Sequence, residues 1–368
     1  MTLSFKKSKA CQTFKGNVWH EGRFIETEFY IARGKIKEGK KGKVIESAYI
    51  IPPFTDPHIH GGWGFSFQRG EFESLERKLR EQGINFAIPT LENDDLRHMA
   101  RLASEFKAYR KDHPQSIFPF LRVEGPFISR EKLGVQAESY VLKPEAKNIQ
   151  KFLALEEIRL FTFAPELKGT EKLIAKAVRL GKIPSVGHSN ASFEDFLRCH
   201  SLGVKHMTHF PNAMRGLHHR DLGLVGAGLL LDDVHLEIIA DGIHTSFEFI
   251  SLVLRIRGLT FSLISDLIAP AFSGKDDFEG RKILRNGRKI TTSEGIIAGG
   301  STTVAEQVRL LFTRGEKPEN LVSLACLNSL DFFRLPRPSL EEGSTASFLL
   351  LDEEMKVTAV YIKGERIN

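Results

Sequence analysis

The sequence predicts an α/β protein: a (β/α)8 TIM-like barrel with a small β-sandwich domain formed by the N- and C-terminal segments. Eight apolar runs, most of them followed by an amphipathic helical pattern, predict the barrel. Patterns typical of strands alone occur only at the two chain ends, which predicts that these ends pair into one sheet domain. A chain of 368 residues that is 41% hydrophobic and 27% charged is apolar enough to bury a large core, which excludes a disordered protein.

The first segment, residues 1–53, contains short alternating or aromatic runs such as GNVWHEGRFIETEFYIARGKI, separated by glycine and lysine. Alternation of this kind predicts strands and hairpins. The run KIKEGKKGK, from Lys35 to Lys43, is expected to form a solvated hairpin turn rather than a binding patch.

The barrel is expected over residues 54–335, with strands near residues 51, 86, 119, 160, 184, 205, 236 and 261. Helical segments such as FESLERKLREQG and TEKLIAKAVRLGK repeat their apolar residues every three or four positions, as one buried helix face requires. Between residues 273 and 299 the alternation is interrupted. The Asn286-Gly287 dipeptide predicts a hairpin there, placed near the barrel mouth.

The tail, residues 336–368, contains SFLLLDEEMKVTAVYIKGERI, which predicts two strands joined near residues 352–356. Together with residues 1–53 it is expected to form the small β domain. No repeat of 20 to 50 residues is present that would predict a solenoid instead.

Charge, cysteine content and hydropathy restrict the function classes. The net charge is +6, but residues 1–45 hold eleven Lys and Arg against four Asp and Glu, so the rest of the chain is nearly neutral. A nucleic-acid partner is therefore not expected. Cys11, Cys199 and Cys326 form no CxxC pair, which excludes a thiolate zinc site. The N-terminal segment MTLSFKKSKACQTF lacks an apolar stretch and no run reaches membrane-spanning length, so a cytoplasmic protein without a membrane partner is expected.

Two histidines at the end of the first barrel strand are the first candidate metal ligands. His58 and His60 lie in PFTDPHIHG, and a spacing of two places both imidazoles on one face of a strand. At the C-terminal mouth of a barrel, two such histidines can bind one divalent ion. An HxH motif alone is more often structural, so the argument depends on further ligands.

Three more candidate ligands end other predicted strands: Glu124 in RVEGPF, His188 in VGHSN and His209 in MTHF. Each follows an apolar run and precedes a turn, so a barrel would bring them to the same rim. Nitrogen and oxygen donors without thiolates suit zinc, iron or manganese, and donor softness does not separate these.

Asp266 ends the last barrel strand in LISDLI. It can ligate metal, or accept a proton from water and deliver it to a leaving group. Alternatively it caps a helix, a common role for Asp at a strand-to-helix turn. Asp241 and His244 in DGIH also end a strand and can face a substrate, although Asp241 can equally stabilise its own turn.

In this arrangement the sequence resembles the amidohydrolase superfamily, and within it the enzymes that deacetylate amino-sugar phosphates. The resemblance spans nearly the whole chain. It is carried, in the family's order, by DPHIHGGWG (56–64), EGPF (124–127), GHSNA (187–191), THFPNAMRGLHHRDLGLVGAG (208–228), ADGIH (240–244), SDLIAP (265–270) and AGGSTT (298–303).

The resemblance implies hydrolysis of the N-acetyl group of N-acetylglucosamine 6-phosphate to glucosamine 6-phosphate and acetate. It implies a metal held by Glu124, His188 and His209, with Asp266 as general base and then general acid. His58 and His60 imply a second metal bridged by Glu124, hence one or two divalent ions per subunit. The implied contacts to the sugar phosphate are Val135, Gln136, Asn212, Ala213, Arg220, His244 and a closing loop of Gly299, Gly300, Ser301 and Thr302. A homodimer that completes the phosphate site is also implied.

The chain departs from the family at a few positions. Many members have Gly-Ala-His after EGPF, and the histidine contacts substrate. This chain has Gly134, Val135 and Gln136, and glutamine donates a hydrogen bond but carries no proton charge. Pro211 and Arg215 also differ, which suggests an altered sugar preference. The alternatives are a related amidohydrolase that acts on another N-acetylhexosamine phosphate or a cyclic amide, and a catalytically silent polyanion binder.

Overall fold

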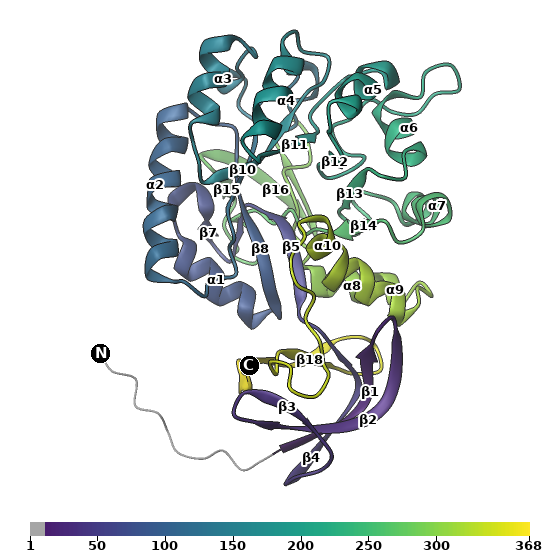
Figure 1. Ribbon diagram of the computed structural model, residues 1–368. Helices are drawn as coiled ribbons and strands as arrows, with labels where there is room; N and C mark the ends of the chain where they lie inside the picture. Colours follow the sequence, from purple (N-terminus) through teal and green to yellow (C-terminus); the bar gives the residue numbers. More distant parts are fainter. Residues whose placement is uncertain (1–11) are drawn as a thin grey trace.

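The computed structural model describes residues 12–368. Residues 1–11, which include Cys11 and three of the eleven basic residues of the N-terminal segment, lie outside the described residues. Figure 1 shows two parts, a barrel surrounded by helices and a smaller sheet below it. No helix in the described range is both long and apolar enough to cross a membrane.

The barrel is an eight-stranded sheet in which every assigned strand pair is parallel. Its strands follow the chain in order and are β5 (Phe54–Ile59), β8 (Ile84–Leu91), β9 (Leu121–Phe127), β10 (Ile158–Phe163), β11 (Ile183–Val186), β12 (His206–Met207), β13 (His235–Ile238) and β14 (Phe261–Leu263). The predicted eight-stranded α/β fold is therefore confirmed.

The segment after β14 closes the ring against β5. The backbone N–H of Asp266 donates to the carbonyl oxygen of His58 at 3.0 Å, and that of His60 donates to Leu267 at 2.9 Å. Closure therefore places Asp266 beside the two histidines, although about 200 residues of chain separate them.

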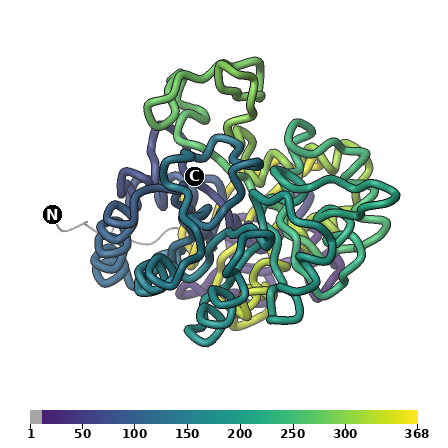
Figure 2. Tube along the Cα trace, turned by 90° about the horizontal axis from the view of Figure 1, so that it is seen from above, coloured from purple at the N-terminus to yellow at the C-terminus, as the bar shows by residue number. Residues whose placement is uncertain are grey.

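Helices surround the barrel, as Figures 1 and 2 show. In the first of them, Phe72, Leu75 and Leu79 are buried, so the three- and four-residue spacing of the sequence becomes one face against the strands. The helices are α1 (Phe72–Glu81), α2 (Leu96–Asp112), α3 (Ala146–Leu153), α4 (Thr170–Arg179), α5 (Phe193–Ser201), α6 (Gly223–Leu230), α7 (Phe247–Arg257), α8 (Val304–Phe312), α9 (Pro318–Val322) and α10 (Asn328–Phe332), with a π-helical turn at Ser323–Leu327 between the last two.

Both chain ends join one seven-stranded mixed sheet in the order β20-β19-β18-β4-β1-β2-β3. Its strands are β1 (Gln12–His20), β2 (Arg23–Ala32), β3 (Lys35–Glu38), β4 (Lys43–Ile51), β18 (Phe348–Leu351), β19 (Val357–Ile362) and β20 (Glu365–Arg366). The predicted pairing of head and tail is confirmed by β4, which pairs with β18.

This sheet curls around an aromatic core. Phe29 on β2 and Phe348 on β18 are three strands apart, which corresponds to about 14 Å in a flat sheet. Their ring centroids are only 5.1 Å apart, and Phe14 contacts both rings. Curling buries these rings between the two ends of one sheet, as in a sandwich.

One local prediction is wrong. The segment from Lys35 to Lys43 was expected to be a hairpin turn, but β3 pairs with β2, whereas β4 pairs in parallel with β1 on the other side. The exposed residues 39–42 therefore cross between non-adjacent strands. Glycine and lysine indicate a solvated connection, but they do not determine which strands it joins.

The excursion at 273–299 forms the predicted hairpin at Asn286-Gly287, built from β15 (Asp277–Phe278), β16 (Arg281–Asn286) and β17 (Lys289–Thr292). Figure 2 shows this green segment projecting beyond the ring of helices. Phe278, Ile283 and Ile290 pack with Ile268 of the barrel rim, which fixes the hairpin over the mouth. Short strands β6 (Gly61–Gly62) and β7 (Phe65–Ser66) lie after β5.

Candidate metal centre and active-site pocket

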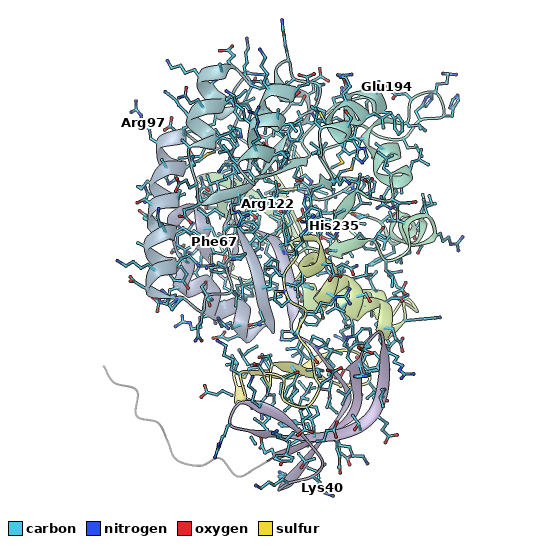
Figure 3. The ribbon with its side chains drawn as sticks, in the orientation of Figure 1. Lys40, Phe67, Arg97, Arg122, Glu194 and His235 are labelled. Carbon is cyan, nitrogen blue, oxygen red and sulfur yellow. The ribbon has the colours of Figure 1, made fainter. Side chains whose placement is uncertain are left out.

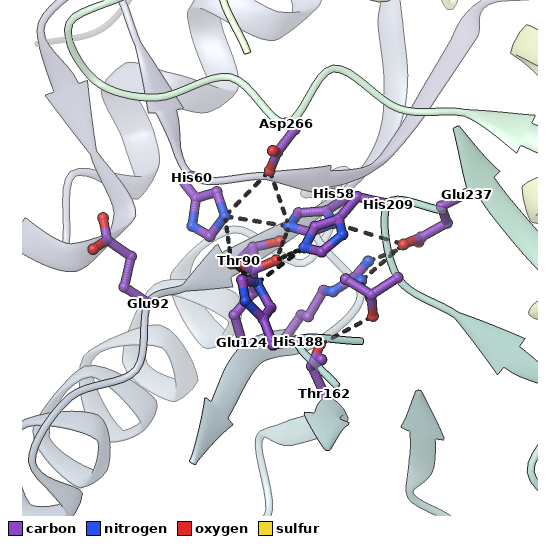
Figure 4. A network of polar contacts seen from close by, with 12 residues as sticks. His58, His60, Thr90, Glu92, Glu124, Thr162, His188, His209, Glu237 and Asp266 are labelled. Atoms are coloured by element: carbon purple, nitrogen blue, oxygen red, sulfur yellow. Dashed lines mark hydrogen bonds and ion pairs between the residues drawn. The ribbon is translucent and has the colours of Figure 1, made fainter. Parts of the chain in front are cut away.

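Two histidines from the first barrel strand face one point. The Nε2 atoms of His58 and His60 are 3.2 Å apart, and both side chains are buried. The spacing of two residues therefore puts both imidazoles on one side of the strand, as the sequence predicts. Figure 4 shows them converging with Asp266 above the barrel strands.

Glu124 lies at the centre of the cluster. Its Oε1 is 2.9 Å from Nε2 of His209 and 3.1 Å from Nε2 of His58. Its Oε2 is 3.5 Å from Nε2 of His188 and 3.6 Å from Nε2 of His60. Burial alone would raise the pKa of Glu124, but the surrounding imidazoles of His209, His58 and His188 hold it well below its usual range.

The backbone at three of the strand ends is unusual. His188, His209 and Asp266 have φ angles of 45°, 34° and 50°, in the left-handed region that side chains rarely adopt. Such conformations cost free energy and persist where the surrounding structure imposes them, often at functional sites. Each of these residues turns its side chain inward where its strand ends.

His188 is oriented by a backbone hydrogen bond. Its Nδ1 lies 2.9 Å from the carbonyl oxygen of Lys132, which can only accept, so Nδ1 carries the proton. In the neutral ring, Nε2 of His188 then carries a free lone pair. This atom lies 3.1 Å from Nε2 of His209. The Nδ1 contact to Lys132 thus fixes the tautomer that a metal ligand needs.

Asp266 completes the cluster from the opposite side. Its Oδ1 is 3.2 Å from Nε2 of His58 and 3.4 Å from Nε2 of His60. Burial opposes ionisation, but the adjacent His58 and His60 lower the pKa of Asp266 below its ordinary value. No helix begins directly after Asp266, so the helix-cap alternative does not apply.

The donor set fits a divalent cation. The ligand atoms of His58, His60, Glu124 and Asp266 all lie within 4.8 Å of one another, and so do those of Glu124, His188 and His209. Glu124 Oε1 and Asp266 Oδ1 make no hydrogen bond of acceptable geometry to any residue between 12 and 368. Nitrogen lone pairs and carboxylate oxygens that converge in this way are the arrangement that zinc, iron or manganese accepts.

A buried ion pair lies directly beneath this cluster. Arg122 and Glu237 are fully buried and bind through two parallel hydrogen bonds of 2.7 Å. Figure 3 shows Arg122 inside the barrel. Glu237 Oε2 lies 3.6 Å from Nδ1 of His58, so the pair contacts the ring edge opposite the cluster. Burial opposes ionisation of the Glu237 carboxyl, but the adjacent Arg122 guanidinium holds its pKa well below the usual range.

A cavity of about 420 Å³ opens above the cluster. Its lining contains six of the residues predicted to contact substrate: Val135, Gln136, Asn212, Ala213, His244 and Gly299. The hairpin and the loop after it contribute Phe278, Ile296, Ile297 and Ala298. The excursion recognised in the sequence therefore forms part of the pocket wall.

Four predicted substrate residues lie outside the lining of this pocket. Arg220 is exposed on the loop between β12 and α6. Gly300 is buried, and its N–H donates to the carbonyl of Asp266 at 2.7 Å. The Ser301 hydroxyl donates to the Arg288 carbonyl, and Thr302 is buried with its carbonyl bonded to Gln307. Gly300 therefore supports the Asp266 strand end, whereas Ser301 is bound to the hairpin and Thr302 to α8.

His244 is oriented toward the pocket by Asp241. Asp241 accepts hydrogen bonds from the N–H groups of Ile243 and His244, and its Oδ2 lies 2.7 Å from Nδ1 of His244. Asp241 thus stabilises its own turn, one of the two alternatives open from the sequence. Nε2 of His244 is buried and has no hydrogen-bond partner within residues 12–368.

Sequence reasoning missed Glu92, Lys132 and the Arg122–Glu237 pair. Glu92 follows an apolar run at the end of β8 and lines the pocket, so the signal that identified Glu124 could also have found it. Arg122 and Glu237 interrupt apolar strands with a charge, which is also a readable signal.

Glu92 supports a prediction about stability and pH. Burial raises the pKa of Glu92 from its ordinary value of 4.5 to about 7, so the folded metal-free protein binds a proton that the unfolded chain releases. Its contribution to the free energy of unfolding is therefore lost as pH rises from about 4.5 to about 7. Replacing Glu92→Gln should stabilise the chelator-treated protein more at pH ~8 than at pH ~5.5, by about 2 kcal/mol.

Urea unfolding midpoints at the two pH values measure this difference. Glu353→Gln, which changes an exposed carboxylate, is the matched control and should show little pH-dependent difference. A Glu92→Gln effect that is the same at both pH values would contradict the prediction.

Comparison with known proteins agrees with this architecture. The Amidohydrolase family model matches residues 49–367. An N-acetylglucosamine-6-phosphate deacetylase from Lysinibacillus sphaericus is 28% identical, with 87% of this chain and 85% of that protein covered. An N-acetylgalactosamine-6-phosphate deacetylase from Shewanella sp. is also 28% identical, with 87% and 84% covered. The crystal structure of N-acetylglucosamine-6-phosphate deacetylase from Thermotoga maritima has a TM-score of 0.84 and 30% identity, with 94% and 96% covered. The chain belongs to the amidohydrolase family.

Proposed function

We propose that this protein hydrolyses the N-acetyl group of N-acetylglucosamine 6-phosphate to glucosamine 6-phosphate and acetate, as a metal-dependent deacetylase of amino-sugar catabolism. The observation that carries the proposal is the convergence of four imidazoles and two carboxylates at the floor of a pocket lined by Asn212, Ala213 and His244. The names of the Lysinibacillus and Thermotoga relatives support the same substrate.

His58, His60, Glu124, His188 and His209 would hold the metal, which we propose to be zinc, iron or manganese, one or two ions per subunit. Both donor groups contain Glu124, so its two oxygens can serve two ions. When bound, such an ion supplies Lewis acidity, which polarises a carbonyl and makes water nucleophilic near neutral pH.

Asp266 is the proposed general base and general acid. It is buried and its pKa is lowered, so the carboxylate is ionised and can accept a proton from the attacking water. Delivery of that proton to the amide nitrogen lets the C–N bond break and the amine leave as a neutral group. Acetate keeps the oxygen supplied by water, so the reaction balances as a hydrolysis.

Substrate contacts are proposed from the pocket wall. The free Nε2 of His244 and the turn at Asn212 and Ala213 are placed to contact the sugar phosphate, with Val135 and Gln136 across the cavity. Gly299 closes one side, Gly300 supports the Asp266 strand end from behind, and Ser301 and Thr302 continue the same loop. Positioning by such contacts holds the amide near the base.

Arg220 is the proposed partner of the phosphate across a homodimer interface. It is exposed and forms no ion pair within the described residues. Leu217 on the same loop and Leu230 on α6 are 53% and 58% exposed, which supports an interface there.

We further propose a barrel domain of residues 54–335, a small β domain of residues 1–53 and 336–368, and action in the cytoplasm without nucleic-acid or membrane partners.

Acetate release from the 6-phosphates of N-acetylglucosamine, N-acetylgalactosamine and N-acetylmannosamine, combined with elemental analysis of the purified protein, tests the proposal. Fastest turnover of the gluco isomer is expected. The Shewanella relative makes the galacto isomer the second candidate, because its identity is equal to that of the Lysinibacillus enzyme. Turnover of a cyclic amide without acetate from any amino-sugar phosphate would overturn it.

The number of ions supports a separate prediction. Replacing both His58→Ala and His60→Ala removes two of the four candidate donors on the Asp266 side and none on the His188 side. The metal-to-protein ratio is expected to fall by about half, because Glu124, His188 and His209 keep one site. Elemental analysis after gel filtration measures it, and an unchanged ratio would show that these three residues hold all the metal.

A further inference from the structure

We infer that Gln136 is a positioning residue for Glu124, holding the central carboxylate of the metal centre in place through its side-chain amide. The inference rests on the metal centre of the proposed function but not on the identity of the substrate. The sequence alone predicts Gln136 only as a substrate contact.

The first observation is a direct contact. Nε2 of Gln136 donates to Oε2 of Glu124 at 2.7 Å, and the Gln136 side chain is buried. A hydrogen bond from a neutral amide to a buried carboxylate is charge-assisted, so it is stronger than an ordinary one. It restricts rotation of the carboxylate about its last torsion, which would otherwise be broad.

The second observation fixes the orientation of the amide. The backbone N–H of Asn93 donates to Oε1 of Gln136 at 2.8 Å. A backbone N–H can only donate, so the amide oxygen must face Asn93 and the amide nitrogen must face Glu124. The reversed amide would set two donors against each other at Asn93 and two acceptors against each other at Glu124.

The loops that carry Gln136 and Asn93 are held close to the strand of Glu124. Asn93 Nδ2 donates to the carbonyl of Ala137 at 3.3 Å, and the N–H of Gln136 donates to Leu133 at 3.0 Å. Gly125, which follows Glu124, has a φ of 134°, and a Cβ there would lie 3.0 Å from Oδ1 of Asn93. The close approach therefore requires glycine, and it ties the end of β8 to the end of β9.

The Gln136 contact gives the two carboxylate oxygens of Glu124 different neighbours. Oε2 receives the amide and lies beside His188 and His60, whereas Oε1 faces His209 and His58. A single restrained orientation thus presents Glu124 to both donor groups at once. Glutamine does this without adding a charge to the cluster, because its amide is neutral.

The same end of β8 supplies a matched control. Oε1 of Gln68 accepts the backbone N–H of Glu92 at 3.1 Å, as Gln136 does for the next residue, Asn93. Gln68 is also buried, but its amide nitrogen donates to Asp94 at 2.6 Å rather than to Glu124. Gln68→Leu therefore removes an equivalent backbone partner and leaves the Glu124 contact unchanged.

The test measures metal affinity by chelator competition on the full-length protein, with zinc and manganese each used alone. Gln136→Leu is expected to weaken metal binding about 10- to 100-fold, the usual effect of losing a partner of a metal ligand. Gln68→Leu should change affinity less than about threefold, while lowering the melting temperature of the metal-free protein comparably. Gln136→Met, which preserves the unbranched shape, provides a second variant in case the leucine variant does not fold.

Metal affinity in the Gln136 variants within about threefold of wild type would overturn the inference, and so would an equal loss in the Gln68 variant. Because no substrate enters the measurement, absence of acetate release would count against the proposed function and leave this result standing.

Discussion

Replacing Asp266→Asn is expected to reduce turnover about 10²- to 10⁴-fold, the range for loss of a general acid-base group. Asparagine keeps the shape and one oxygen, but its amide cannot accept a proton at neutral pH. Five other donors remain in the two groups, so the metal-to-protein ratio is expected to stay close to wild type. The loss should therefore appear in kcat rather than in metal content.

Acetate release and elemental analysis on the same preparation separate these two quantities. Asp232→Asn, which changes a carboxylate that is 92% exposed, is the matched control and should keep the wild-type rate. A wild-type rate in Asp266→Asn would remove Asp266 from the mechanism. A parallel loss of metal and rate would instead make Asp266 chiefly a ligand.

Much of the fold and the candidate centre can be predicted from local pattern, because parallel barrel strands bring their C-terminal ends to one rim. His58, Glu124, His188 and Asp266 each end an apolar run, and this shared position predicts that they meet. The roles assigned to them stay predictions, since the geometry brings the side chains together but does not measure catalysis.

Contacts across the barrel or between loops could not be predicted in this way. Arg122 and Glu237 are on β9 and β13, four strands apart in a ring of eight, so they face each other only because the barrel closes. Gln136 reaches Glu124 only because Asn93 and Gly125 bring two loops together. Residues 39–42 connect β3 to β4, which are not neighbours, because β4 pairs in parallel with β1. No residue of the connecting turn predicts this pairing.

The buried pair beneath the centre supports the largest expected effect on stability. Arg122→Met should lower the free energy of unfolding by about 3–5 kcal/mol, because it leaves the Glu237 carboxylate buried without a counter-charge. Arg122 also donates to the Pro57 carbonyl at 3.1 Å and to Thr208 at 3.0 Å, and both bonds are lost. The shift in denaturant midpoint of the metal-free protein measures the effect.

Two further variants show whether charge or packing causes the loss. Arg101→Met breaks an exposed i,i+4 pair with Glu105 and should cost at most about 0.5 kcal/mol. Arg122→Met combined with Glu237→Met removes both buried charges, so it should recover much of the stability lost in the single variant. His58 would then lose the carboxylate 3.6 Å from its Nδ1, so the double variant should fold well but bind metal more weakly. A double variant no more stable than Arg122→Met alone would show that arginine acts through packing and its carbonyl bonds. In that case the pair would not serve as an electrostatic support for His58.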